Sequence, residues 1–142
     1  MNPKQEAEKL MNEMLPVAEK MLRQHGEFFP YGGYMKPTGE IVHVGAKDPN
    51  TDRPKSKELI GILQDSFRTM VKNKECDVTA MVFDVVVPIP SSNRKRNAIQ
   101  VCLDHIDNYS AEVFFPYKLI DNQVIYEDTF AQEGKYEIFR RR

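Results

Sequence analysis

The chain has 142 residues, of which 41% are hydrophobic and 29% are charged, a composition typical of a folded globular domain and not of a disordered segment. Its 20 lysines and arginines are balanced by 21 aspartates and glutamates, so it has no overall charge to attract nucleic acid or an anionic membrane. Two cysteines without metal-ligand spacing and the absence of a long apolar stretch predict a cytoplasmic protein with free thiols and no membrane segment.

The first predicted helix runs from residue 4 to about residue 25. Apolar residues recur there at spacings of three and four, and charged residues occupy the other side. Pro16 removes one backbone donor and crowds the preceding turn, so we expect a kink or a break near Leu15. We expect Gly26 to end this helix.

The second predicted helix spans roughly residues 55–74. Its apolar side chains form one stripe that includes Leu63 and Phe67, behind Pro54 and with Ser56 as a candidate cap. Such a stripe needs an apolar surface to cover, so we expect this helix to pack on a sheet.

The remaining apolar segments predict antiparallel strands. Residues 78–87 are apolar on both faces, as in a central strand, except for Asp84. Residues 97–106 and 110–119 alternate with the period of half-buried strands, and 28–46 reads as an additional hairpin between the helices. The whole chain is therefore predicted to be one α+β domain, an antiparallel sheet packed by two helices in the order α-β-β-α-β-β-β-β.

Two hairpin loops can be predicted from the side-chain pattern. The apolar faces of the strands at 97–106 and 110–119 match only if the loop between them is odd in length, which favours a three-residue loop at 107–109. The turn at 121–122 suits two residues, because it would pair Leu119 with Val124 on the core face.

Four short motifs, most of them aromatic, carry a resemblance to known sequences. They are Glu27-Phe28-Phe29-Pro30-Tyr31-Gly32, Gly39-Glu40-Ile41-Val42, Val113-Phe114-Phe115-Pro116-Tyr117 and Phe130-Ala131. Together they resemble a small family of uncharacterised bacterial proteins over most of the chain. The resemblance implies a bacterial source and this fold, and it transfers no functional residue because the family has no assigned activity.

The aromatic hairpin is the first candidate binding feature. Phe29, Tyr31 and Tyr34 could line a groove, since the neighbouring glycines at 32–33 permit close backbone approach. The favoured alternative is that these aromatics close the core between helices and sheet, with a bulge at the glycines.

A row of carboxylates is the second candidate. The three-residue loop would set Asp104 across from Glu112, and Asp84 joins them if its strand pairs suitably, so that three acids project away from the core. Such a row could accept a divalent metal or a cationic partner. No glycine-bearing metal loop or histidine joins it, so we favour a solvated outer face and predict no metal or cofactor.

Two basic clusters, at 91–96 and 140–142, could contact phosphate. Neither contains an aromatic residue for base stacking, which favours an exposed hairpin tip and a frayed tail and predicts no nucleic-acid partner.

Nucleophilic catalysis has no recognisable motif in this sequence. The residues that could supply it in three dimensions are His25, His43 and His105 with Cys76, Cys102 or Ser110. A lone histidine near a strand end is more often structural, although triads are spatial arrangements that need no sequence motif.

The sequence favours a non-enzymatic protein-binding module, immunity-protein-like or chaperone-like, with an unknown protein partner and a homodimer as one option. Its candidate binding surface comprises Phe29, Tyr31, Tyr34, Asp84, Asp104 and Glu112. The alternative is a small-molecule-binding protein or an unrecognised enzyme with a pocket between the 28–46 hairpin and the sheet. An apolar pocket with converging polar groups would favour the alternative, and a broad exposed patch would favour the module.

Overall fold

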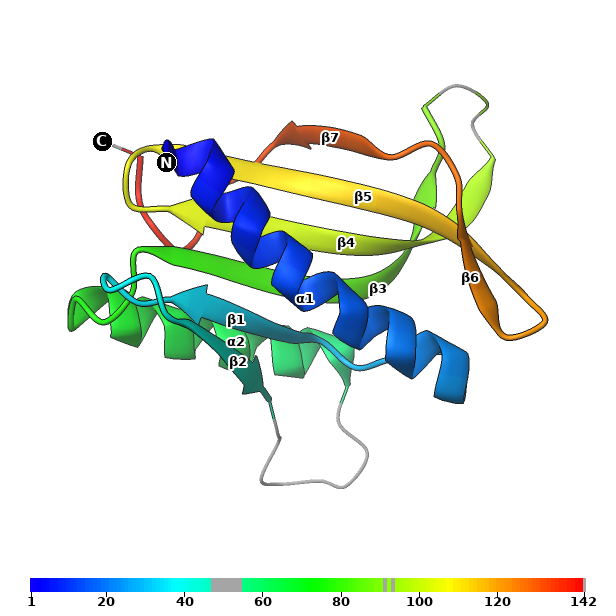
Figure 1. Ribbon diagram of the computed structural model, residues 1–142, viewed down its shortest axis with the longest axis horizontal. Helices are drawn as coiled ribbons and strands as arrows, with labels where there is room; N and C mark the ends of the chain where they lie inside the picture. The colour runs from blue at the N-terminus through cyan, green and yellow to red at the C-terminus, as the bar shows by residue number, and fades with distance from the viewer. Residues whose placement is uncertain (47–54, 91, 93, 142) are drawn as a thin grey trace.

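Two helices pack on opposite faces of a seven-stranded antiparallel sheet in the computed structural model, which describes residues 1–46, 55–90, 92 and 94–141 (Figure 1). The elements are α1 (Pro3–His25), β1 (Tyr31–Met35), β2 (Ile41–Gly45), α2 (Ser56–Lys72), β3 (Val78–Pro88), β4 (Lys95–His105), β5 (Tyr109–Ile120), β6 (Gln123–Tyr126) and β7 (Phe130–Glu133). The strand order is β2-β1-β3-β4-β5-β6, and β7 also pairs with β5. The α+β prediction is confirmed, with β7 as one strand more than expected.

α1 has the length expected from the sequence and is capped at both ends. Asn2 and Gln5 form a capping box at its start, and Gly26, with a φ of 75°, ends it in the left-handed region. The helix continues through Pro16, so the break that the sequence allowed does not occur. No helix within the described ranges has the length and hydropathy needed to cross a membrane.

α2 begins at Ser56, which is its first residue and not its cap. Lys55 holds the N-cap position without a side-chain hydrogen bond, so the predicted Ser56 cap is wrong. The expected stripe is confirmed by the burial of Leu59, Leu63 and Phe67. Pro54, and Ser91, Asn93 and Arg142 of the basic clusters, lie outside the described residues.

The two faces of β3 supply two separate cores. Val78, Ala80 and Val82 pack with α1, whereas Met81 and Phe83 pack with α2. Because successive strand residues point to opposite faces, a strand between two helices must be apolar at almost every position. This explains the unbroken apolar run and confirms the central-strand prediction.

The glycine pair of β1 allows both helices to come close. Gly32 and Gly33 keep regular pairing with β2 and β3, so the expected bulge is absent. A Cβ on Gly32 would collide with the carbonyl oxygen of Ala80 and lie 3.2 Å from the Phe67 ring of α2. A Cβ on Gly33 would lie 2.6 Å from Sδ of Met14 in α1. These contacts explain why both positions are occupied by glycine.

The loop between β4 and β5 has the predicted odd length but a different position. It spans 106–108 and not 107–109, so the register shifts by two residues. Asp104 consequently pairs with Ser110, and the predicted pairing of Asp104 with Glu112 is wrong.

The turn between β5 and β6 matches its prediction. Asp121 and Asn122 both have positive φ, 50° and 62°, as a two-residue type I′ hairpin requires. Leu119 pairs with Val124, as expected.

Candidate functional site

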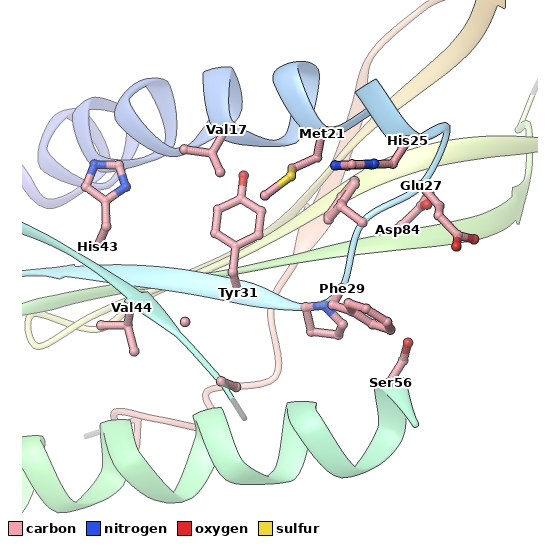
Figure 2. Close-up of a pocket in the computed structure, with 14 residues that line it drawn as sticks. Val17, Met21, His25, Glu27, Phe29, Tyr31, His43, Val44, Ser56 and Asp84 are labelled. Carbon is pink, nitrogen blue, oxygen red and sulfur yellow. The ribbon is translucent and has the colours of Figure 1, made fainter. Parts of the chain in front are cut away.

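A cavity of about 860 Å³ opens at the edge of the sheet where β2 ends, between α1 and the start of α2. Figure 2 shows the side chains that line it. They are Val17, Met21, His25, Glu27, Phe28, Phe29, Pro30, Tyr31, His43, Val44, Gly45, Ala46, Ser56 and Asp84. The 28–46 hairpin belongs to the sheet, and the cavity lies between this hairpin, Asp84 of β3 and the two helices.

The segment that joins α1 to β1 forms the rim of the cavity. The two adjacent phenylalanines that follow Gly26 separate there. Phe28 packs edge-on against Tyr31, with ring centroids 5.8 Å apart. Phe29 is 60% exposed, which is unusual for so large an apolar side chain. The rim therefore presents an aromatic ring to solvent beside an aromatic wall.

Tyr31 lies on the wall of the cavity that faces α1. Its hydroxyl donates a hydrogen bond of 2.6 Å to the backbone carbonyl of Met14. Burial raises the pKa of this hydroxyl far above its usual range, and the nearby Glu19 adds to the effect. Tyr31 thus stays neutral and ties β1 to the helix.

Asp84 is the one acid that points into the apolar α1 face of β3. The hydroxyl of Tyr117 donates a 2.8 Å hydrogen bond to its Oδ1. Burial raises the pKa of Asp84, and the charge of Glu27 raises it further, while hydrogen bonds from Tyr117 and the Phe28 backbone lower it in part. Asp84 is therefore a fixed, partly desolvated carboxyl in the cavity wall.

The polar groups are unevenly placed around an apolar centre. In Figure 2, His25, Glu27 and Asp84 lie toward one end of the cavity, and His43 lies toward the other. Aliphatic and aromatic side chains occupy the space between these ends. This combination of an apolar body and a few polar groups is typical of small-molecule sites.

The described residues that line the cavity include no activated nucleophile. Among the described residues, no hydrogen bond joins a histidine of the cavity to a serine or cysteine. His105 lies elsewhere, with Nε2 3.1 Å from Glu6 and Nδ1 accepting from the backbone of Asp107. Since Nδ1 accepts, Nε2 carries the proton and donates to Glu6, which is a structural role.

Both cysteines are free and are unsuited to nucleophilic attack. Burial raises the pKa of Cys76 to about 11 and that of Cys102 to about 12, with neighbouring carboxylates adding to each. The thiolate is the reactive form, and it is disfavoured at both positions.

The structure divides the predicted binding surface into parts. Phe29, Tyr31 and Asp84 meet at the cavity. Tyr34 lies on the opposite face of the sheet, where its ring centroid is 6.5 Å from that of Phe67 in an edge-on contact. The prediction that these aromatics form one groove is therefore wrong for Tyr34.

The predicted row of three acids is also divided. Asp84 lies on the α1 face, whereas Asp104 and Glu112 lie on the α2 face and are only 4% and 7% exposed. The space over them is lined by Gln64 of α2 and by residues that follow β7, and Gln132 of β7 donates a 2.6 Å hydrogen bond to Glu112. The expectation that these acids project into solvent is wrong.

A second cavity, of about 140 Å³, contains these buried acids. In the part of the chain that the structure describes, Oδ1 of Asp104 has no hydrogen-bond partner. Burial raises the pKa of Asp104 to about 7, the Ser110 hydroxyl moderates this rise, and Glu137 and Glu112 add to it. No group of three metal-ligating side chains occurs within the described ranges.

Two arginines of the basic clusters are engaged with carboxylates. Nε of Arg96 lies 3.1 Å from Glu127, and Nη1 of Arg141 lies 3.2 Å from Glu133. Arg141 also stacks on the ring of Tyr136. Both pairings are structural and leave less charge for phosphate.

Sequence reasoning named His25 and His43 only as possible partners of a nucleophile, and it did not assign the α1 wall of the cavity to a binding site. Val17, Met21 and His25 recur at a spacing of four, which places them on one face of a helix. This face lies beside the buried stripe, so the spacing was a usable signal. His43 carries no such signal, because its position depends on how β2 meets the helices.

Comparison with known proteins adds no functional assignment. The chain matches no protein family model, no curated protein and no solved structure. The resemblance of its aromatic motifs to a small bacterial family therefore stays a prediction, and so does every functional interpretation of the cavity.

Proposed function

We propose that this protein binds a small, largely apolar molecule in the cavity beside α1. The observation that carries the proposal is the cavity itself, whose volume of about 860 Å³ falls within the range of roughly 300–1,000 Å³ that ligand sites occupy. Its walls combine aliphatic and aromatic side chains with a small number of polar groups.

Binding is favoured over catalysis by the state of the polar groups. Tyr31 is bonded to the helix backbone and Asp84 to Tyr117, so each has a structural partner. Groups held in this way can orient a ligand. Nucleophilic catalysis would need a nucleophile with an adjacent base, and no hydrogen bond joins such a pair among the described lining residues.

The proposal can be tested with Nile red, a neutral dye that fluoresces in apolar surroundings. Val17 points into the cavity from α1, so Val17→Trp should fill the site and weaken dye binding at least tenfold. Lys20 is exposed on the same helix and does not line the cavity, which makes Lys20→Trp the matched control. Equal dye binding by the two variants would refute this use of the cavity.

A second proposal, a non-enzymatic protein-binding module, is supported by the β5–β6 hairpin. Ile120 and Ile125 are 52% and 47% exposed, and the register places them on the same face of the hairpin. β6 also ends the strand path, which leaves an edge available for pairing with a second copy.

Light scattering over a range of protein concentrations tests this second proposal. A dimer that forms through this hairpin should dissociate in Ile125→Lys, because a charge would enter the apolar contact. Asn12→Lys adds the same charge at an exposed position of α1, outside this hairpin, and serves as the control. A monomer at every concentration would remove the homodimer from consideration.

A further inference from the structure

The charges around the cavity are of one sign. Among the described lining residues, Glu27 and Asp84 are carboxylates, and there is no lysine or arginine. Glu27 is exposed and forms no ion pair with another described residue. Figure 2 places both carboxylates toward the same end of the cavity. That end has a negative potential which no described cation offsets.

Among the described residues, no cation pairs with Asp84. Half-buried carboxylates are commonly paired, because an unpaired charge loses hydration without compensation. The groups that act on the pKa of Asp84 are burial, Tyr117, the Phe28 backbone and Glu27, and none of them is a cation. The burial that raises this pKa would be offset by a positive charge brought by a ligand.

Tyr117 holds this carboxyl in one orientation. Its hydroxyl occupies Oδ1 at 2.8 Å, and Tyr117 is itself buried. A carboxylate has two oxygens and several acceptor positions, so further acceptor capacity is available beside this bond. The site is thus preorganised to accept a donor.

Aromatic rings lie at the same end of the cavity. Phe28 and Phe29 follow Glu27 directly in the chain, and both line the cavity. Aromatic faces attract cations, most strongly ammonium and guanidinium groups. They also suit the carbon atoms next to a charged nitrogen, so they can hold both parts of an amphiphilic cation.

We propose that the ligand is an amine with an apolar body, whose ammonium group lies between Asp84 and Glu27 and whose apolar part fills the space along Val17, Met21 and Tyr31. This inference rests on the proposed small-molecule function and narrows it to one class of ligand. An anionic ligand is disfavoured because it would bring a third negative charge to that end of the cavity.

The test compares three molecules with the same chain and different head groups: octylamine, octanol and octanoate. Each is added to the full protein at about pH 8, where an alkylammonium group is protonated, to displace Nile red. Octylamine should bind at least tenfold more tightly than octanol, and octanoate should bind most weakly. Equal affinities for the amine and the alcohol would overturn the amine proposal while leaving small-molecule binding intact.

Two variants separate the effect of a carboxylate charge on ligand binding from effects on folding. Asp84→Asn keeps an acceptor for Tyr117 and removes the charge, so it should reduce octylamine affinity to that of octanol without changing octanol binding. Glu27→Gln lies at an exposed position and serves as a second variant that does not endanger folding. If both variants keep the full preference for the amine, the ammonium site is refuted. If none of the three molecules displaces the dye, the proposed function itself fails.

Discussion

The hydroxyl of Tyr31 in β1 and the backbone carbonyl of Met14 in α1 are joined by a hydrogen bond of 2.6 Å. Tyr31→Phe should lower the free energy of unfolding by about 1 kcal/mol, because a largely buried polar contact between strand and helix is lost. Tyr109→Phe is the control, since its half-buried hydroxyl makes no side-chain hydrogen bond that the described residues record. Urea denaturation measures both, and equal losses would show that the bond adds no stability.

Gly32 and Gly61 should respond in opposite ways to alanine. A Cβ on Gly32 collides with the backbone of β3, so Gly32→Ala should destabilise the fold by roughly 2 kcal/mol or more. Gly61 lies inside α2 with open space around its Cα, so Gly61→Ala should stabilise the protein by about 0.5–1 kcal/mol. The melting temperatures of both variants test the close approach of β1 and β3, which predicts a decrease for Gly32→Ala and an increase for Gly61→Ala.

Asp104 should make the protein less stable as the pH rises. Its folded pKa of about 7 lies above its usual 3.8, so its contribution is complete below the lower value and is lost as the pH passes the higher one. Between about pH 6 and about pH 8 the free energy of unfolding should fall by roughly 1 kcal/mol.

Two variants assign this pH dependence to its source. Asp104→Asn should remove most of the slope and make the protein more stable at alkaline pH, because a buried carboxylate no longer ionises. Asp65→Asn changes an exposed acid on α2 and should leave the slope unchanged. A slope that persists in Asp104→Asn would place the titrating group elsewhere.

Phe67 anchors α2 to the sheet. It is completely buried, and Phe67→Ala should cost roughly 3–5 kcal/mol through lost burial and a cavity. Leu63→Ala should cost roughly 2–5 kcal/mol for the same reason. Ile62 is only half-buried on the same helix, so Ile62→Ala should cost clearly less. Denaturant midpoints rank the three, and equal midpoints would contradict the packing of α2.

Local chemistry made parts of the fold predictable. The register of β5 and β6 follows from the Asp121-Asn122 turn, whose two residues tolerate positive φ. The end of α1 follows from Gly26 in the same way. The loop at 106–108 was displaced in the prediction because apolar Ile106 reads as a strand residue, and pattern fixes only whether a loop is odd or even.

The burial of Asp104 and Glu112 could not be read from alternation. Alternation tells which residues share a face, and it does not tell what covers that face. The cover comes from the segment after β7, which ends in Ile138 and Phe139 and packs on the α2 face. β7 itself pairs with β5 within the sheet, and its polar residues give a weak strand signal. A segment distant in sequence thus buries a sheet face that alternation alone would leave exposed to solvent.

The residues that meet at the cavity could not be predicted from local sequence patterns either. Tyr31 and Asp84 were both singled out from the sequence, Tyr31 as part of the aromatic hairpin and Asp84 as part of the carboxylate row. They meet because β1 pairs with β3, with Tyr31 opposite Val82, and because α1 crosses that face of the sheet. Pairing between segments so far apart in sequence depends on the whole fold.

The two-sided packing of β3 also constrains how the gene can vary in length. Inserting or deleting one codon within Val78–Phe83 would exchange the residues offered to α1 with those offered to α2 beyond that point. Thr79 would then face the wrong layer, and Phe83 would enter a space shaped for smaller side chains. A change of two codons would restore the facing of each residue. Homologous sequences should therefore show length differences in the loops and none, or even-numbered ones, within this strand.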